Sequence, residues 1–406
     1  MTSLPAPNRR WQIFSAYFLA LTIWIAVLVM FLPGRWITPN LFQAGLFLLA
    51  TLWGVAILWR PFAVEWSFAL VPLTGTVAWG LMQLATGRTV GRWETWMAVL
   101  TWMGNLAAFF LAMQVCASER VRRRFLDLLL YFGFVLSVVS VVQYFSSNGK
   151  IFWFYPTYDP AVLGPFVSRD RYAAFMEMLL PLAIVQMLGG GQRPLRFAVM
   201  GAAMYASVIA GASRAGALLM TAELIVVPGL AWTRNYFPRG KMRMTTTGIW
   251  LLVFIFTAVV GWTVLWNRFQ DPDPLKGRRE MLAASLKMVR AKPYFGFGLG
   301  NYQNAYPKYS TVDFGSMVNH VHNDWVEWAA EGGIPFSLLV LCIAAWSVPK
   351  AVKSLWGIGV LMVFVHSVVD FPLQDPVLEV WLFVLLGVLA AENSAQRKSR
   401  GSGVTC

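Results

Sequence analysis

The sequence predicts an all-α protein that crosses a lipid bilayer many times. Of its 406 residues, 58% are hydrophobic and only 13% are charged, and the chain holds 20 Trp and 29 Phe. Soluble globular domains carry about 25% charged residues, so this balance is typical of a polytopic membrane protein. We therefore expect about twelve transmembrane helices, and one long outer loop that contains an amphipathic helix.

Twelve apolar runs have about the length that a membrane-spanning helix needs, roughly 17 to 25 residues. They are residues 12–32, 41–59, 66–86, 96–117, 125–145, 172–188, 195–211, 215–232, 248–266, 325–348, 355–371 and 377–391. The first run follows Arg9 and Arg10, as in a signal peptide, but no small-residue cleavage site ends it, so we expect it to remain as the first span. We treat residues 1–406 as a single transmembrane domain, with residues 267–323 as a loop inserted between spans nine and ten.

The distribution of Lys and Arg predicts the orientation of the spans. If the N-terminus is cytoplasmic, the inner segments hold eighteen of these residues and the shorter outer segments hold seven. Cytoplasmic loops of membrane proteins carry such an excess. Both termini are therefore predicted to be cytoplasmic and the long loop to lie outside. The formal charge of +14 reflects this bias and contact with anionic lipid, which argues against nucleic acid as a partner.

The outer loops differ in character. Residues 146–171 are rich in Pro, Tyr and Gly and predict an irregular loop, whereas residues 278–292 have apolar positions near helical spacing among basic ones, which predicts an amphipathic helix on the outer surface. Gly296, Gly298 and Gly300 resemble a nucleotide-binding fingerprint, but the spacing differs and no strand precedes them, so a tight turn is expected. The three cysteines, Cys116, Cys342 and Cys406, are scattered and predict neither a disulfide framework nor a zinc site.

Seven basic or imidazole side chains from separate stretches fall on the predicted outer face. They are Arg169, Arg171, Arg214, Arg278, Arg279, His320 and His322. Arginine is always protonated and its planar fork matches phosphate oxygens in pairs, so such a face suits an anion such as pyrophosphate, although surface arginines also meet lipid head groups. Arg214 lies between two apolar runs with almost no loop to carry it into water, and a charge placed there is usually functional.

His322 is the candidate general base, because a neutral imidazole can accept a proton from an attacking hydroxyl near neutral pH. Asn323 is expected to cap the following helix and so to fix the position of His322. A His-x-His metal site at His320 and His322 is an alternative, but no cysteine or third histidine lies near them in the sequence. Glu177, Glu223 and His366 lie inside predicted spans and favour a transporter as the alternative from another class.

The chain resembles a known family at five stretches. These are residues 164–171 (GPFVSRDR), 213–216 (SRAG), 277–298 (from Gly277-Arg278 to PYFGFG), 322–333 (His322-Asn323 followed by Gly333) and 366–372 (HSVVDFP). Their order and spacing are similar to those of bacterial O-antigen ligases and of the related O-antigen and exopolysaccharide polymerases. Phe336 and Leu282 depart from the ligase pattern, which leaves both ligase and polymerase open.

The resemblance implies a GT-C-like glycosyltransferase of the bacterial inner membrane that acts in lipopolysaccharide or polysaccharide biosynthesis. It would move a glycan from undecaprenyl pyrophosphate to an acceptor sugar at the periplasmic face, without a metal or other cofactor. His322, Arg214 and Arg278 correspond to the family's catalytic positions. We place Arg169, Arg171, Arg279, His320 and Asn323 as substrate contacts, with lipid A core or a growing polysaccharide as the acceptor and the bilayer as a further partner.

Overall fold

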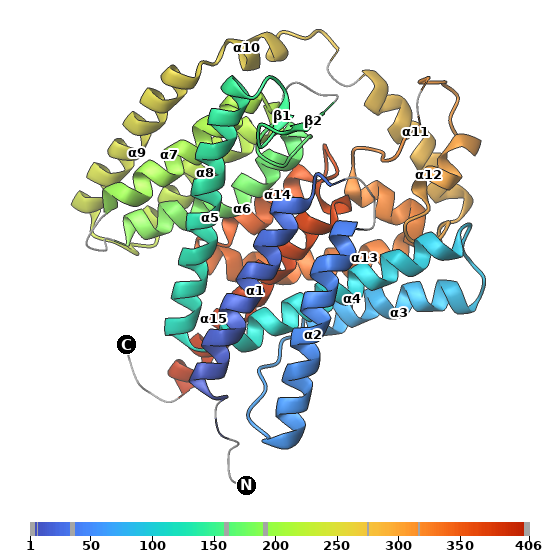
Figure 1. Cartoon of the computed structure of the whole chain (residues 1–406), viewed down its shortest axis with the longest axis horizontal. Helices are drawn as coiled ribbons and strands as arrows, with labels where there is room; N and C mark the ends of the chain where they lie inside the picture. Colours follow the sequence, from blue (N-terminus) through green and yellow to red (C-terminus); the bar gives the residue numbers. More distant parts are fainter. Residues whose placement is uncertain are drawn as a thin grey trace.

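The computed structural model describes residues 5, 7–32, 37–157, 162–189, 194–273, 276–315 and 317–401, and this part of the chain is almost entirely helical (Figure 1). The helices are α1 (Arg9–Val29), α2 (Ile37–Trp59), α3 (Leu70–Ala85), α4 (Arg92–Val115), α5 (Glu119–Ser146), α6 (Arg169–Leu188), α7 (Pro194–Gly211), α8 (Arg214–Thr233), α9 (Arg239–Val260), α10 (Thr263–Phe269), α11 (Lys276–Ala291), α12 (Tyr302–Ala305), α13 (Asp324–Ser354), α14 (Ile358–His366) and α15 (Pro376–Gly401). Short 3-10 turns cover Tyr306–Lys308 and Pro372–Gln374. The prediction of an all-α polytopic membrane protein is confirmed.

Ten of the described helices are long and apolar enough to cross a membrane, against the twelve runs counted in the sequence. The other two runs form shorter helices: α3 has 16 residues and α14 has nine. Nine residues rise about 13 Å, which is less than the roughly 30 Å of a hydrocarbon core. Helix α14 ends early because the backbone turns at His366, whose carbonyl accepts hydrogen bonds from Val369 N (2.9 Å) and Asp370 N (3.0 Å).

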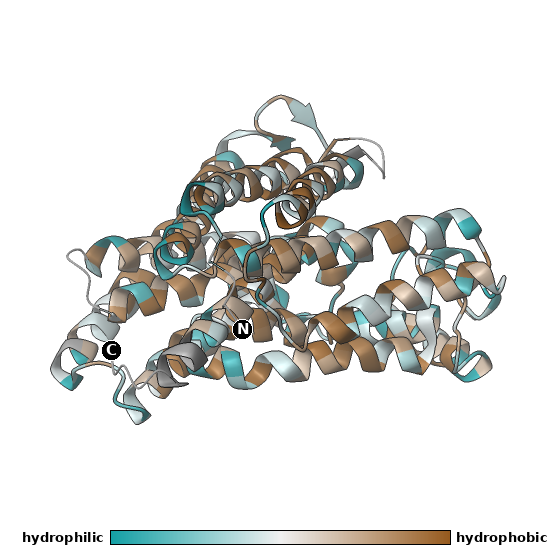
Figure 2. Cartoon of the chain, turned by 90° about the horizontal axis from the view of Figure 1, so that it is seen from below, coloured by the Kyte–Doolittle hydropathy of each residue, from teal (hydrophilic) through white to brown (hydrophobic). Residues whose placement is uncertain are grey.

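The start of α1 and the end of α15 lie at the same end of the molecule (Figure 1). At that end Ala63 N donates to the carbonyl of Pro5 (2.9 Å). At the opposite end Thr38 Oγ1 donates to the carbonyl of Val29 (3.0 Å). We call this opposite end the distal end; α10, α11 and the β1–β2 hairpin lie there (Figure 1). Apolar residues run along the helices and hydrophilic residues gather near their ends (Figure 2).

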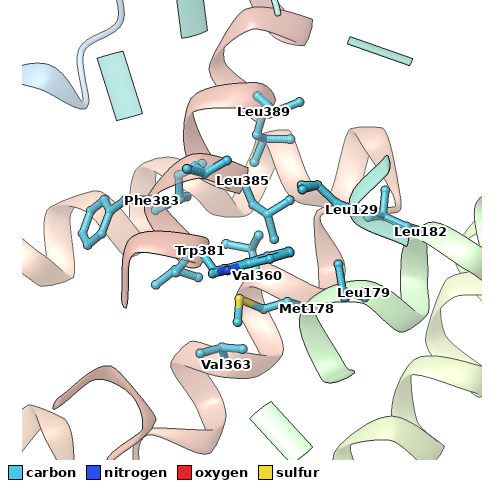
Figure 3. Close-up of a cluster of buried hydrophobic side chains, with 14 of the residues drawn as sticks. Leu129, Met178, Leu179, Leu182, Val360, Val363, Trp381, Phe383, Leu385 and Leu389 are labelled. Atoms are coloured by element: carbon cyan, nitrogen blue, oxygen red, sulfur yellow. The ribbon is translucent and has the colours of Figure 1, made fainter. Parts of the chain in front are cut away.

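Helices α6 and α15 form the centre of the bundle, because most of their residues are buried within the protein. Helix α15 packs mainly on α4, and α6 packs on α7, α8 and α14. Trp381 of α15 is fully buried and lies close to Met178 of α6 and Val360 of α14 (Figure 3). This apolar centre holds α6 and α14 side by side. The distal end of α6 carries Arg169 and Asp170, and the turn after α14 carries Asp370.

The loop between α5 and α6 contains more structure than the predicted irregular loop. Strands β1 (Lys150–Ile151) and β2 (Tyr155–Pro156) pair antiparallel, and Leu163 and Phe166 form an isolated bridge. The predicted amphipathic helix is confirmed as α11, but its apolar face packs against protein instead of lipid. Ala284 and Met288 of that face are buried in a cluster with Ala330 of α13.

The glycine-rich stretch after α11 forms the expected tight turn. Gly296, Gly298 and Gly300 all have positive φ angles, of 63°, 100° and 72°. A Cβ atom on Gly296 would lie 2.3 Å from the carbonyl oxygen of Glu331. Facing this turn, α13 is kinked at Gly333, where φ is 76° and a Cβ would lie 2.2 Å from the Tyr294 carbonyl oxygen. The two glycines let the long loop dock directly on the backbone of α13.

We predict that Gly333→Ala strongly destabilises the protein. The new methyl group adds backbone strain of about 1–3 kcal/mol and a steric clash of similar size. The matched control is Gly54→Ala, because Gly54 lies in α2 with nothing within 4 Å of the added Cβ. Thermal unfolding in detergent should show a much lower melting temperature for the Gly333 variant only. Similar melting temperatures for the two variants would contradict this packing.

Candidate functional site

The start of α13 places His322 at the distal end. Asn323 caps the helix as predicted, because its Oδ1 accepts from Val326 N (3.0 Å). Its Nδ2 donates to the carbonyl of Val368 (2.7 Å), so the amide also ties α13 to the turn after α14. His322 itself has a positive φ of 58°, an uncommon conformation that this double attachment holds in place. The predicted substrate contact of Asn323 stays a prediction.

A hydrogen bond fixes the imidazole of His322. Its Nδ1 lies 2.8 Å from Oδ1 of Asp370, whose side chain is only 3% exposed. Burial by itself raises the pKa of Asp370, but the hydrogen bond from His322 and the positive charges of His322, His366 and Arg278 outweigh burial and lower this pKa. An ionised carboxylate only accepts hydrogen bonds, so Nδ1 carries the proton. In the neutral imidazole, Nε2 is then the nitrogen with a free lone pair.

A second histidine–carboxylate pair stands beside the first. Nδ1 of His320 lies 2.7 Å from Oε1 of Glu327, a side chain that is 1% exposed. Phe371 separates the two imidazoles: its ring stacks on His320 at 4.5 Å and meets His322 edge-on at 4.6 Å, between ring centroids. Each imidazole thus binds a different carboxylate, and the Phe371 ring lies between the two imidazoles. His320 and His322 therefore have different surroundings. Within the described part of the chain, no three His, Cys, Asp or Glu side chains are grouped to hold a metal ion.

Arg278 connects His322 to the other half of the site. Its Nη2 lies 3.7 Å from Oδ1 of Asp370 and 3.8 Å from Oδ2 of Asp170, while its Nη1 donates to the carbonyl of Val369 (2.8 Å). Asp170 in turn accepts a hydrogen bond of 2.6 Å from Oγ of Ser213, the residue before Arg214. A continuous polar network therefore runs from His322 through Arg278 to the Ser213-Arg214 turn. The structure brings together residues from five distant segments of the sequence.

Arg214 and Arg268 hold each other in place through the backbone. Arg214 Nη1 donates to the carbonyl of Arg268 (2.9 Å), and Arg268 Nη1 donates to the carbonyl of Ala212 (2.7 Å). Burial and the nearby charges of Arg169, Arg214 and Arg278 lower the pKa of Arg268, whereas Asp170 opposes them. This pKa remains far above neutrality in any arginine. The guanidinium groups of Arg169, Arg214, Arg268 and Arg278 are thus close enough for their charges to interact.

The remaining predicted arginines differ in their partners. Arg171 forms a close ion pair with Asp375 (3.1 Å), and its guanidinium carbon lies 4.8 Å from the centre of the Phe371 ring. Arg279 is 65% exposed and forms a close ion pair with Asp273 (2.6 Å). Arg169 has no hydrogen-bond or ion-pair partner among the described residues, and it lines the cavity that is described in the next paragraph. Arg169 is thus available to a ligand, whereas Arg171 and Arg279 are already paired.

A cavity of about 840 Å³ opens in front of these groups, which we call the basic cavity. Its lining includes Arg169, Arg171, His320, His322 and Phe371. Arg214 and Arg278 are not in the lining, but Arg278 lies 3.8 Å from Asp170 of the cavity wall, and Ser213, next to Arg214, donates a hydrogen bond to the same carboxylate. The volume lies in the range of roughly 300–1,000 Å³ that is typical of small-molecule sites.

Several groups of the site were not singled out from the sequence. They are Asp170, Arg268, Glu327, Asp370 and Phe371. Asp370 and Phe371 lie in the 366–372 stretch that carries the resemblance, and Asp170 lies in the 164–171 stretch, so those motifs were the available signal. Arg268 had none, because it is one of many basic residues in a long loop.

The fold and this site define a multi-pass membrane protein with a basic, histidine-bearing cavity at one end of its helix bundle. Residues 198–341, from α7 to the middle of α13, match the family model described as O-Antigen ligase. This match over residues 198–341 supports the O-antigen ligase family, and the resemblance noted in the sequence is confirmed. The family implies glycosyltransferase activity in O-antigen assembly, with lipid-linked glycans as substrates. No curated protein and no solved structure matches the chain.

We predict that Asp370→Asn uncouples His322 from its fixed tautomer. Glycan transfer should fall about 100-fold or more, as when an orienting carboxylate is removed from a histidine base. The carboxylate also stabilises the fold, and because the pKa of folded Asp370 is lowered, this stabilisation is complete above about pH 4 and is lost as the pH falls further. The difference in melting temperature between the wild type and the variant should be constant from about pH 5 to pH 8 and shrink below about pH 4. A difference that grows on acidification would contradict the assignment.

Proposed function

We propose that the protein transfers a glycan from undecaprenyl pyrophosphate to a hydroxyl of an acceptor sugar, as an O-antigen ligase does. The observation that carries the proposal is the network from His322 through Asp370, Arg278 and Asp170 to Ser213. It supports a base and an anion site at one place on the bundle. The distal end would face the periplasm of a bacterial inner membrane, with both termini in the cytoplasm.

The arginines have the geometry of an anion site that is held ready. Arg214, Arg268 and Arg278 each use one Nη1 to bind a backbone carbonyl at 2.7–2.9 Å. Their ion pairs are long, at 3.7–4.0 Å for Arg278 and Arg214. A guanidinium has five N–H donors, so each arginine is positioned by one of them and keeps others for phosphate oxygens. Together with Arg169 they would bind the pyrophosphate and stabilise the negative charge that grows as it leaves.

His322 would supply the base. Nε2 would accept the proton of the acceptor hydroxyl while the hydroxyl oxygen forms a bond to C1 of the donor sugar. The bond from C1 to the phosphate oxygen breaks, and its electron pair leaves with the pyrophosphate. A direct displacement of this kind inverts the configuration at C1. Asp370 would stabilise the imidazolium that forms, and no step requires a metal or a cofactor.

The acceptor separates two readings within the family. Lipid A core as acceptor would make the protein a ligase, and a growing chain would make it an O-antigen or exopolysaccharide polymerase. Mass analysis of the product formed when purified protein receives the lipid-linked donor and only one acceptor type distinguishes them.

A transporter or flippase for the lipid-linked glycan remains the second candidate. Glu223 favours it, because both carboxylate oxygens are buried without a hydrogen-bond partner among the described residues. Glu177 and His366 are instead paired with each other (2.9 Å). A glycosyltransferase releases undecaprenyl pyrophosphate as the glycan is transferred, and a transporter releases none. Glu223→Gln should leave transfer within about twofold of the wild type if the enzyme reading holds, since the residue then has no catalytic part.

We predict that His322→Ala lowers the rate of transfer by about 100- to 10,000-fold, the usual contribution of a general base. Binding of the lipid-linked donor should change little, because the arginines remain. Turnover is measured with purified protein in liposomes, and donor binding in the absence of acceptor. Near-normal turnover at normal protein level would remove the assigned role of His322.

We also predict that Arg268→Gln lowers kcat/KM for the donor by about tenfold or more, because a hydrogen bond to a charged group contributes about 1.5–3 kcal/mol. Arg268→Lys should recover part of the loss, since it keeps the charge but not the planar fork. Arg290→Gln is the matched control, because Arg290 is an exposed residue of α11 outside the lining of the basic cavity. Equal losses in the Arg268→Gln and Arg290→Gln variants would mean that only general surface charge matters.

A further inference from the structure

A second cavity of about 270 Å³ adjoins the basic cavity. We call it the acidic cavity, because five carboxylates line it: Glu94, Glu327, Glu331, Asp375 and Glu379. The two cavities share the side chains of Arg171, Gln303, Asn319, His320 and Asp375. Only one layer of side chains therefore separates them, and the His320–Glu327 pair belongs to that layer.

The charge of the acidic cavity excludes the donor's pyrophosphate. Its two basic side chains, Arg171 and His320, are each bound to a carboxylate of the same lining. Glu94 and Glu331 leave an excess of negative charge, and like charges repel strongly where little water screens them. A phosphate group is therefore confined to the basic cavity, and the acidic cavity is left for a group that is neutral or positive.

The lining has the chemistry that a sugar ring needs. Trp102 and Trp328 offer aromatic faces and edges for the C–H groups of a ring, and Trp328 is almost fully buried. Two polar groups of the lining have no hydrogen-bond partner among the described residues: the buried Nε2 of Gln374 and the carboxylate of Glu94. Since buried polar groups are normally satisfied, an unpaired donor at a cavity wall points to a ligand. A sugar hydroxyl both donates and accepts, so it satisfies both groups.

We propose that the acidic cavity binds the terminal sugar ring of the acceptor, and that it selects neutral or amino sugars over acidic ones. This inference rests on the proposed function and adds the class of acceptor. The acceptor ring would lie on the Glu94 side of the shared side chains. Its reacting hydroxyl would cross the shared layer beside His320 and Phe371 to reach His322.

The test uses variants that change the acidic cavity and leave the basic cavity intact. Glu94→Gln removes a charge from the lining, and Ala98→Leu fills space on the same face of α4. The control is Glu280→Gln, which removes an exposed carboxylate from α11 outside both cavities. Each full-length variant is purified, checked for its melting temperature and assayed in liposomes with lipid-linked donor and acceptor.

Glu94→Gln should raise the acceptor KM by about tenfold, the change that one lost hydrogen bond to a charged group produces. Ala98→Leu should raise it by about as much, because the larger side chain takes up space that the ring needs. The donor KM should stay within about twofold of the wild type, as should both constants of the Glu280→Gln control. Unchanged acceptor KM in Glu94→Gln at normal stability would overturn the proposal. A rise in the donor KM alone would assign the cavity to the donor and would also overturn it.

Direct binding separates this inference from the proposed function. Saturation-transfer NMR on donor-free protein measures three probes: the methyl glycosides of glucose, glucosamine and glucuronic acid. The first two should bind and the third should not, and Glu94→Gln should reduce this discrimination by about tenfold. Binding without any glycan transfer would leave the cavity assignment standing while the proposed function fails. Transfer by the wild type with equal binding of all three probes would refute the cavity assignment alone.

Discussion

The guanidinium of Arg278 lies between two carboxylates that are two hundred residues apart in the sequence. Asp170 begins α6 and Asp370 follows α14, and each lies within 4 Å of Arg278 Nη2. Without a cation between them, two largely desolvated carboxylates would repel, and at least one would have to take up a proton. Because Arg278 comes from the long loop, the same contact fastens that loop over the distal end. The positions of His320 and His322 on the loop depend on this attachment.

Separation of charge follows from that arrangement. The loosely paired arginines lie on the α6, α8 and α10 side of the His322–Asp370 pair, and most carboxylates of the acidic cavity lie on the α4, α13 and α15 side. Phe371 stands between the two imidazoles and contacts Arg171 as well. An aromatic ring at this place keeps the two histidine–carboxylate pairs from exchanging partners. One histidine can then serve a basic environment and the other an acidic one.

Hydropathy and charge counts were sufficient to predict which residues share the distal end. The side of the membrane on which Arg214 and His322 lie depends only on the number of spans between them and on where Lys and Arg accumulate. The capping role of Asn323 was also predictable, because it needs only local geometry. Arg268 was not, since its position depends on a hydrogen bond to the Ala212 carbonyl, and any residue could supply that carbonyl. The role of Asp370 was not predictable either. The hydropathy pattern predicted a span over residues 355–371, whereas in the structure α14 ends at His366 and a turn positions the Asp370 carboxylate.

The glycine turn shows the same limit. Positive φ angles at Gly296, Gly298 and Gly300 agree with the turn expected from the sequence. The turn contacts the kinked backbone of α13 at Gly333. This contact forms only because glycines on both the turn and α13 let the two backbones meet without side chains between them. Glycine spacing predicts a tight turn, but it does not predict which segment of the chain the turn packs against.

The buried Glu177–His366 pair explains why Asp170 and Asp370 come within reach of one guanidinium. Both side chains are fully buried, and His366 Nδ1 contacts both oxygens of Glu177, at 2.9 and 3.1 Å. Gly359 of α14 lets the two helices approach closely, since a Cβ there would lie 2.4 Å from the Glu177 carbonyl oxygen. Glu177 lies seven residues after Asp170, about two helical turns, and is therefore on the same face of α6. On α14, the His366 carbonyl anchors the turn that carries Asp370. The pair inside the bundle thus fixes how α6 is aligned along α14. In this alignment Asp170 and Asp370 lie close enough together for Arg278 to contact both. A buried ion pair is costly to form, and a role in fixing register is one reason for a protein to retain it.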